Sequence, residues 1–358
     1  MRKIKLISKA GFNYNEPFII AEMSGNHNQS LERALKIVEA AVSCGVDAVK
    51  LQTYTPDSMT LNISNQKGFF IEDKNSIWYG RTCYDVYQEA ALPYEWHKPI
   101  FDKCKELGIV CFSTPFDLLA VDFLEKLDCP IYKIASAEII DIPLLKEVAQ
   151  TKKPVIISTG MASLEEIKEG VNVFENNGCT NLTLLKCTTD YPAKIEESNL
   201  LTIPDLKKHF PDCKIGLSDH TLGIGAAIAS VALGTEVIEK HFTLSRSEGG
   251  IDSDFSMEPQ EMKQLVKECH NAHKALGKVS YELSEAEKIN VNFRRSLYVV
   301  KDIKKGEKFT AENIRSIHPG YGLHPKYFYD LIGKIAKTDL KEGTPMSFNF
   351  IINKEGYD

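Results

Sequence analysis

The first 245 or so residues alternate short apolar runs with helical patterns. The apolar runs are rich in β-branched residues, and each becomes polar only at its C-terminal end. There are eight of them: Pro17–Glu22, Ala48–Gln52, Ile109–Pro115, Ile131–Ala135, Val155–Thr159, Leu182–Thr188, Lys214–Asp219 and Val237–Phe242. Nearly continuous apolar runs of this length are typical of parallel strands that are covered on both faces. The pattern therefore predicts eight parallel strands.

The segments between these runs carry signals for helix starts and ends. The apolar residues between Leu31 and Val42 share one helical face and are followed by Gly45. Ser163-Leu-Glu-Glu166 is a capping box, and a long helix is expected from Pro259 to Gly277. Eight strands alternating with helices predict a (β/α)₈ TIM barrel, with an open doubly wound sheet as the alternative.

The residue composition and the pattern of apolar positions change in two places along the chain. A polar and aromatic insertion, Pro56 to Ala91, follows the second strand, and after Ser280 the chain becomes turn-rich. We expect a barrel domain over residues 1–280, a linker over 281–293, and a small β-rich domain over 294–358. A domain of that size is only marginally stable alone, so we expect it to pack on the barrel or on a second subunit.

Composition and charge narrow the class of protein. The chain has 43 basic and 49 acidic residues and a net charge of −6, which disfavours nucleic acid as a partner. No apolar run is long enough to span a membrane, and the first residues do not resemble a signal peptide. Nine cysteines without CxxC spacing indicate reduced thiols in a cytoplasmic protein.

Polar residues gather at the C-terminal ends of the predicted strands, where the active sites of TIM barrels lie. They include Glu22, Lys50, Gln52, Ser113, Thr114, Lys133, Ser136, Glu138, Ser158, Thr159, Lys186, Thr188, Thr189, Tyr191, Ser218, Asp219, His220, Glu239, Lys240 and His241. Lys50 and Lys133 together with hydroxyl groups suit a phosphate or carboxylate ligand. The alternatives are ion pairing with the nearby glutamates, or a Schiff base on Lys133.

His220 and His241 end neighbouring strands. With a carboxylate such as Glu22, two imidazoles there suit Mn, Fe, Co or Zn, and such a metal would polarise a carbonyl oxygen or orient water. The alternative is a pair of hydrogen-bonded core histidines. The aromatic residues of the insertion, Trp78, Tyr79, Tyr84 and Tyr87, either contact a sugar, form a dimer surface, or pack the insertion onto the barrel. Cys187 reads as a small core residue.

Several motifs resemble the sialic acid synthase family. They are Ile20-Ala-Glu-Met-Ser-Gly-Asn-His27, Lys50-Leu-Gln-Thr53, Phe112-Ser-Thr-Pro-Phe116, Tyr132-Lys-Ile-Ala-Ser136, Ser158-Thr-Gly160, Leu185-Lys-Cys-Thr-Thr-Asp-Tyr-Pro192, Gly216-Leu-Ser-Asp-His220 and Ile238-Glu-Lys-His-Phe242. The tail from Arg294 is similar to that family's antifreeze-like (SAF) domain. The insertion motifs around Tyr54–Ser58 and Tyr84–His97, and Gly322-Leu-His-Pro-Lys326 in the tail, look most like the pseudaminic acid synthase branch.

The resemblance implies a condensation of phosphoenolpyruvate with an open-chain amino sugar, here 2,4-diacetamido-2,4,6-trideoxy-L-altrose. It also implies a divalent metal, commonly Mn or Mg with Co possible, on His220 and His241. Phosphoenolpyruvate is expected at Lys50, Thr114, Lys133, Ser136, Ser158 and Ser218. The sugar is expected near Gln52, Glu138, Thr189, Tyr191, Asp252 and His318. Lys133 and the carboxylates Glu22 and Glu239 are the expected catalytic groups, with proton transfer by either glutamate.

Two residues depart from the family pattern. Thr189 stands where sialic acid synthases usually have Asn, which fits a different sugar. His318 stands where the family usually has an Arg that reaches the sugar pocket of the partner subunit. A neutral His would weaken that contact, and the resemblance still implies a domain-swapped homodimer. The competing hypotheses are a sialic or legionaminic acid synthase, a Schiff-base pyruvate aldolase, and a non-enzymatic carbohydrate-binding protein.

Overall fold

The computed structural model describes residues 7–8, 11–12 and 16–352. The chain divides into two compact units, Met1–Gly277 and Lys278–Asp358. Each unit has its own buried apolar core, and each is described by itself.

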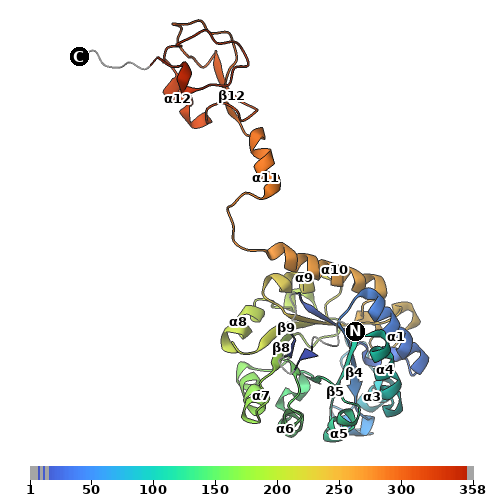
Figure 1. The fold of residues 1–358 in the computed structure, drawn as a ribbon. Helices are drawn as coiled ribbons and strands as arrows, with labels where there is room; N and C mark the ends of the chain where they lie inside the picture. Colours follow the sequence, from blue (N-terminus) through green and yellow to red (C-terminus); the bar gives the residue numbers. More distant parts are fainter. Residues whose placement is uncertain (1–6, 9–10, 13–15, 353–358) are drawn as a thin grey trace. The chain divides into compact units, whose positions relative to one another are not determined.

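The first unit is a closed barrel of eight parallel strands (Figure 1). The strands are β3 (Phe18–Glu22), β4 (Ala48–Thr53), β5 (Val110–Pro115), β6 (Tyr132–Ile134), β7 (Val155–Ser158), β8 (Leu182–Cys187), β9 (Lys214–Asp219) and β10 (Val237–His241). They follow one another around the barrel in chain order, and β10 closes it by pairing with β3. The prediction of a TIM barrel is confirmed, and the open doubly wound sheet is excluded.

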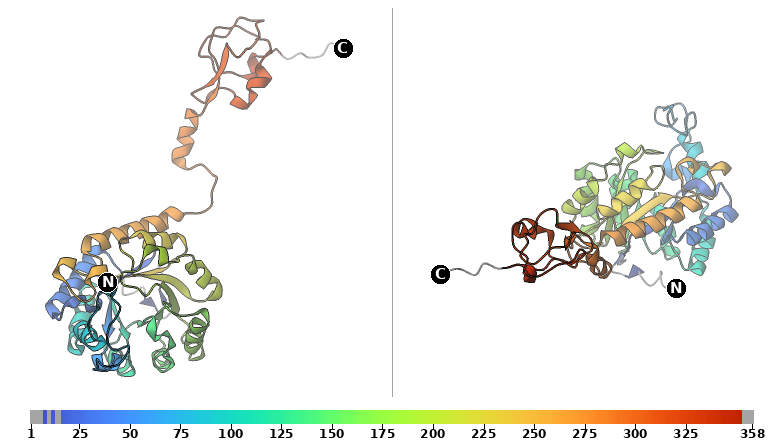
Figure 2. Two further views of the ribbon diagram at one scale, coloured as in Figure 1. Left: turned by 180° about the vertical axis from the view of Figure 1, so that it is seen from behind. Right: turned by 90° about the horizontal axis from the view of Figure 1, so that it is seen from above.

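A ring of helices covers the outside of the strands, as both faces of the molecule show (Figures 1 and 2). The helices are α1 (Leu31–Cys44), α4 (Tyr94–Leu107), α5 (Leu118–Lys126), α6 (Ile142–Gln150), α7 (Leu164–Asn176), α8 (Thr202–His209), α9 (Gly225–Ala232) and α10 (Pro259–Leu276). Ser163 forms the expected capping box with Glu166, and Gly45 ends α1 in the left-handed region that glycine tolerates. The insertion adds α2 (Pro56–Met59) and α3 (Cys83–Ala90) between β4 and α4.

Alternate residues of each strand point to opposite faces of the barrel wall. Ile19, Val49 and Cys111 pack among buried residues of α1, α4 and α10, so they face the helices. Their neighbours Ile20 and Phe112 belong to another core cluster, together with Phe18, Ala48 and Val110. The same alternation decides, at the strand ends, which polar side chains enter the barrel mouth.

The second unit is small and turn-rich, as expected. It contains α11 (Glu285–Asn290), α12 (Phe328–Leu331) and an antiparallel pair, β11 (Ser296–Val299) with β12 (Ile314–Ile317). Isolated bridges such as Ile303 with Leu340 extend the β structure. Its core contains Leu297, Val299, Phe309, Ile314 and Leu331, all fully buried.

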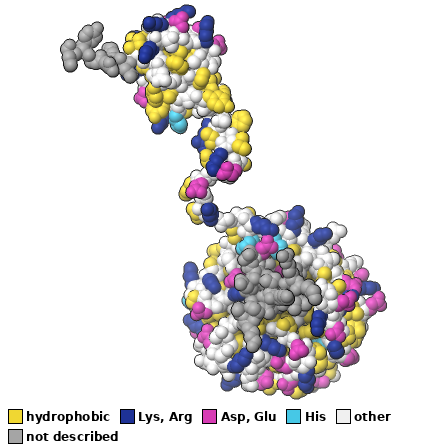
Figure 3. Space-filling model, viewed as in Figure 1, with side chains coloured by type: hydrophobic (Ala, Val, Ile, Leu, Met, Phe, Trp, Pro, Cys, Tyr) yellow, Lys and Arg dark blue, Asp and Glu magenta, His cyan; other side chains and the backbone are white. Residues whose placement is uncertain are grey.

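Basic and acidic side chains are interspersed over the face of the barrel unit seen in Figure 3. Such mixing fits the small net charge of the chain. In the part of the chain that the structure describes, no helix has the length and apolar character needed to cross a membrane.

Candidate active site

Two lysines and two glutamates meet inside the mouth of the barrel, one from the last residue of β3 and the others from within β4, β6 and β10. We call Glu22, Lys50, Lys133 and Glu239 the ionic cluster; all four side chains are at least 95% buried. Lys50 forms an ion pair with Glu22, and its Nζ lies 3.7 Å from Oε2 of Glu239. Nζ of Lys133 lies 3.6 Å from Oε1 of Glu239. Glu239 therefore links the two lysines, and the cluster is neutral when all four groups are charged.

Hydroxyl groups from neighbouring strands form hydrogen bonds with the ionic cluster. Thr114 on β5 accepts a hydrogen bond from Lys50 at 3.2 Å, and Ser158 on β7 accepts one from Lys133 at 2.7 Å. Ser218 on β9 donates to Glu239 at 3.1 Å. Since these groups come from different strands and point to one place, the arrangement can exchange its internal ion pairs for an anionic ligand.

The two glutamates of the cluster are in different electrostatic situations. Burial raises the pKa of Glu22, and its ion pair with Lys50 does not offset that effect. Burial also acts on Glu239, but Lys133 and Lys50 outweigh it and leave the pKa of Glu239 lowered. Of the lysines, burial lowers the pKa of Lys133, whereas Glu22 and Glu239 overcome burial at Lys50 and raise its pKa. Carboxylates whose pKa values are pushed apart are suited to different roles.

His220 and His241 lie together beside the ionic cluster, with ring centroids 5.2 Å apart. We call them the histidine pair. Nδ1 of His220 lies 2.8 Å from the backbone oxygen of Thr188, which can only accept a hydrogen bond. Nδ1 of a neutral His220 must therefore carry the hydrogen, and Nε2 is left with a free lone pair.

Burial and the charges of His220, Lys50, Lys240 and Lys133 hold the pKa of His241 well below its usual value. Its Nδ1 is buried without a hydrogen-bond partner in the structure. A lone pair on His220 and a neutral imidazole with an unsatisfied nitrogen fit a metal held by two protein ligands, with other positions open to substrate and water. Among the described residues, no group of three or more His, Cys, Asp or Glu side chains has the arrangement of a metal site.

Asp252 approaches the site from the segment after β10. It accepts hydrogen bonds from the hydroxyl of Ser24 and, at 2.9 Å, from the backbone N–H of Gly25, and burial raises its pKa. Gln52 donates to Ser24 at 3.2 Å. Ser24 was not among the predicted site residues, and its φ of +48° is rare for a residue other than glycine. No sequence pattern joins it to Asp252, which is 228 residues away.

The other residues expected near the sugar surround the same mouth. The Tyr191 ring lies 4.5 Å from that of His220. Oε2 of Glu138 and Oγ1 of Thr189 are buried without a hydrogen-bond partner. Ser136 accepts a hydrogen bond from the N–H of Gly160 at 3.1 Å. A Cβ at Gly160 would lie 2.2 Å from Oγ1 of Thr189, so only glycine permits this approach.

Two expectations from the strand ends turn out differently. Asp219 and Lys240 point away from the mouth and form a buried ion pair at 2.8 Å. Cys187 is buried but is not a simple core residue, because its sulfur lies 3.9 Å from Nδ1 of His220. Burial would raise the pKa of Cys187, but the contact with His220 outweighs it and lowers the pKa to about 7. His318 belongs to the second unit, where it is exposed and its Nδ1 hydrogen-bonds the backbone oxygen of Phe293.

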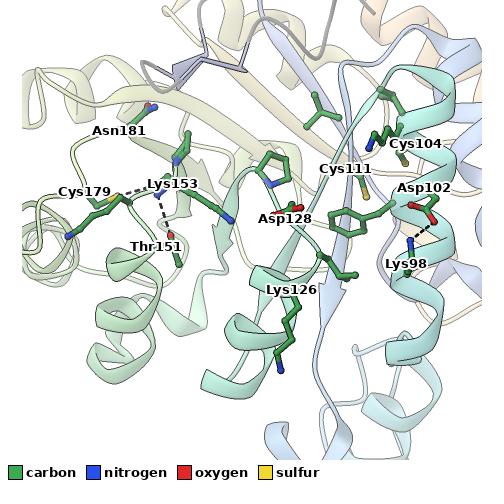
Figure 4. Close-up of a pocket in the computed structure, with 18 of the residues that line it drawn as sticks. Lys98, Asp102, Cys104, Cys111, Lys126, Asp128, Thr151, Lys153, Cys179 and Asn181 are labelled. Atoms are coloured by element: carbon green, nitrogen blue, oxygen red, sulfur yellow. Dashed lines mark hydrogen bonds and ion pairs between the residues drawn. The ribbon is translucent and has the colours of Figure 1, made fainter.

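A cavity of about 1070 Å³ lies elsewhere on the barrel unit (Figure 4). Its walls come from the residues that precede β5, β6, β7 and β8, so it belongs to the N-terminal end of the barrel. Its lysines are partly paired, as in the contact between Lys98 and Asp102 at 2.8 Å. The strand polarity of a TIM barrel places chemistry at the opposite end, where the ionic cluster lies.

Comparison with known proteins agrees with this geometry. Residues 37–281 match the model of the NeuB family, and residues 294–351 match the SAF domain. A pseudaminic acid synthase from Campylobacter jejuni is 47% identical over 91% of this chain and 94% of its own. An N,N′-diacetyllegionaminic acid synthase from the same organism is 40% identical over 90% of this chain and 97% of its own.

A solved structure is also similar. It is the N-acetylneuraminic acid (sialic acid) synthetase from Leptospira borgpetersenii in complex with citrate, with a TM-score of 0.68 and 32% identity over 78% of this chain and 92% of that one. The chain belongs to the NeuB family, the family of sialic acid synthases, and carries a C-terminal SAF domain.

Proposed function

We infer that this protein condenses phosphoenolpyruvate with 2,4-diacetamido-2,4,6-trideoxy-L-altrose and water, and releases pseudaminic acid and phosphate. The observation that carries this proposal is the neutral, buried ionic cluster placed directly beside the histidine pair. The first suits an anionic enol phosphate, and the second suits the carbonyl oxygen of an open-chain sugar. The higher identity to the pseudaminic acid synthase than to the legionaminic acid synthase supports the choice of sugar.

Phosphoenolpyruvate would bind at the lysine side of the mouth. Lys50 would exchange its ion pair with Glu22 for the ligand. Lys50 and Lys133 would hold its phosphate and carboxylate groups while they stay beside Glu239, with Thr114, Ser136, Ser158 and Ser218 as hydrogen-bonding partners. Fixed cations in a buried site also stabilise charge that shifts during reaction. The C3 atom of the enol phosphate then attacks the aldehyde carbon, water adds at C2, and the C–O bond to phosphate breaks.

A proton must reach the aldehyde oxygen as the new C–C bond forms. We assign its transfer to Glu22. Glu239 is held as an anion between two lysines and Ser218, whereas Glu22 contacts one lysine and accepts at 2.9 Å from the backbone N–H of Ser24. Burial also raises the pKa of Glu22. Glu239 would keep Lys50 and Lys133 charged and in place.

The metal ligands in this proposal are His220 and His241. A divalent ion there, Mn or Mg with Co possible, would polarise the aldehyde oxygen and orient water. The sugar would lie along Gln52, Glu138, Thr189, Tyr191 and Asp252. We further propose a homodimer in which His318 of the SAF domain serves the partner subunit's sugar pocket, and a cytoplasmic location.

The decisive experiment supplies the purified enzyme with phosphoenolpyruvate and each candidate sugar, and identifies the product by mass. We expect phosphate release with the trideoxy altrose, and little with N-acetylmannosamine or the legionaminic acid precursor. Preferred turnover of either alternative sugar would replace the proposed substrate. No turnover with any of them would favour a carbohydrate-binding protein.

The Schiff-base alternative has a specific observation in its favour, because burial lowers the pKa of the Lys133 amine. Incubation with pyruvate and borohydride distinguishes the two mechanisms. We expect no mass increase on the protein, because Lys133 is hydrogen-bonded to Ser158 and lies beside Glu239. A stable adduct at Lys133 would establish the aldolase instead.

A further inference from the structure

Trp78 joins the insertion to the segment that follows β10. It lies in a hairpin of the insertion whose arms are held by hydrogen bonds from Ile71 N–H to the Arg81 oxygen and from Gly80 N–H to the Ile71 oxygen, at 2.9 and 3.0 Å. The indole N–H donates to the backbone oxygen of Ile251 at 2.9 Å. The side chain of Ile251 packs against Val86 and Ala90 of α3, with Trp78 at the edge of this small core. The insertion and residues 249–256 therefore form one packed structure.

The packing of the insertion against residues 249–256 affects the candidate active site. Residues 249–256 carry Asp252, which anchors Ser24, and Phe255, whose ring lies 4.8 Å from that of His241. The segment begins with Gly249 and Gly250, both with positive φ, and its later part is held by internal hydrogen bonds such as that from the Ser256 hydroxyl to the Asp252 oxygen. Contacts from outside the segment fix it against the rest of the barrel, and the hydrogen bond from Trp78 to the Ile251 oxygen is one of them.

Trp78 also ends a series of aromatic contacts. Its ring lies 5.8 Å from Tyr191, and Tyr191 lies 5.1 Å from Phe255 and 4.5 Å from His220. We call Trp78, Tyr191 and Phe255 the aromatic wall. It stands beside the histidine pair and presents an apolar surface in a site whose other groups are mostly charged or hydroxylated. An apolar wall favours a methyl group and penalises a hydroxyl that finds no partner there.

We propose that Trp78 is a positioning residue that determines sugar specificity: it holds Tyr191 and residues 249–256 so that the aromatic wall receives the deoxygenated end of a 6-deoxy sugar. The inference rests on the proposed function, because it assumes that the sugar aldehyde lies at the histidine pair. It assigns a role to the insertion, which packs onto the segment after β10.

The test compares the steady-state kinetics of wild type, Trp78→Ala and Trp78→Phe on two sugars, the trideoxy altrose and N-acetylmannosamine. For Trp78→Ala we expect kcat/KM for the trideoxy sugar to fall on the order of 30-fold, and the preference over N-acetylmannosamine to fall about tenfold. KM for phosphoenolpyruvate should change by less than about twofold, since the ionic cluster is not altered. Trp78→Phe keeps an aromatic ring but loses the indole N–H that binds the Ile251 oxygen, so its preference should lie between those of wild type and Trp78→Ala.

Tyr79→Ala is the matched control. Tyr79 follows Trp78 in the chain, and its side chain is half exposed and makes no hydrogen bond or ring contact in the described structure. It should behave as wild type. Intrinsic fluorescence gives a second readout, since Trp78 and Trp96 are the two tryptophans of the chain. Sugar binding should alter the emission of wild type and of Trp96→Phe, and should not alter that of Trp78→Phe.

The outcomes separate the inference from the function on which it rests. Wild type that releases no phosphate with either sugar would remove the proposed function. Wild type that prefers the trideoxy sugar, with a Trp78→Ala variant that keeps the same preference, would overturn the role of Trp78 alone. A rise in KM for phosphoenolpyruvate as large as the loss in kcat/KM for the trideoxy sugar would overturn it as well.

Discussion

The two faces of the barrel wall both carry buried polar side chains at the strand ends, but they differ in how completely those side chains are satisfied. On the outer face, Lys240 bonds Asp219 and the backbone oxygen of Thr221, and Asp219 accepts from Thr221 twice. On the inner face, Lys50 and Lys133 share Glu239 at distances near 3.7 Å, and His241 has an unsatisfied nitrogen.

This difference distinguishes buried polar side chains that stabilise the fold from buried polar side chains that can bind a ligand. A buried ion pair with all its partners in place contributes to a unique packing between strands and helices. A buried cluster with loosely shared partners is able to exchange them for a ligand. Substitutions on the inner face should therefore affect catalysis more than folding, and substitutions on the outer face should do the reverse.

The histidine pair gives the largest expected effect. Replacing His220 or His241 with Ala, or treating the enzyme with EDTA, should reduce turnover on the order of ten thousandfold, equivalent to about 5.5 kcal/mol. Mn or Mg should restore the EDTA-treated wild type and raise its melting temperature, whereas neither variant should show that shift. His209→Ala, on exposed α8, serves as the control. Turnover close to wild type in both variants would remove the proposed metal ligands.

Lys50 is the next test of the inner face. Lys50→Met should lower kcat/KM for phosphoenolpyruvate on the order of a thousandfold, because one of the two cations that face the anionic substrate is lost. It should also destabilise the barrel, since Glu22 would be left without its cation.

The double variant Lys50→Met/Glu22→Gln distinguishes these two effects. It removes one charge of each sign, so stability measured by urea unfolding should largely return while activity does not. If activity returned together with stability, Lys50 and the proposed proton donor Glu22 would both have structural roles, and the inner face would resemble the outer one.

The alternation of strand residues explains how far the sequence could predict this site. The apolar runs predicted the eight strands, and their polar ends contained the ionic cluster and the histidine pair. The same ends also contained Asp219 and Lys240, which differ from functional residues only in the face they occupy. Ser24 and Trp78 could not be assigned, because their partners Asp252 and Ile251 are more than 170 residues away in the chain.

Lys240 tests the outer face. Lys240→Met should lower the free energy of unfolding by about 3–5 kcal/mol, because Asp219 would be left as a buried charge without its cation. The folded fraction should keep kcat/KM within about threefold of wild type, although Lys240 lies between Glu239 and His241 on β10. Urea unfolding and kinetics on the same preparation measure both quantities. A catalytic loss as large as that of Lys50→Met would abolish the distinction between the faces.

The smallest expected effect concerns His97 on α4, which should make the free energy of unfolding depend on pH. Its Nε2 lies 2.8 Å from the hydroxyl of Thr53, which in turn lies 2.6 Å from that of Ser113, and burial lowers the pKa of His97 to about 4. The unfolded chain takes up a proton at this histidine near pH 6.5, so between pH 6.5 and 4 the unfolded state binds more protons. The free energy of unfolding should therefore decrease as the pH falls through that window, by up to about 3 kcal/mol from this residue.

Urea unfolding of wild type and His97→Gln at pH 7.5 and 4.5 isolates the contribution of His97, because all other titrating groups are common to both proteins. Parallel pH dependence in the two proteins would show that His97 is not held neutral, and that this part of the outer face is less completely satisfied than its hydrogen bonds indicate.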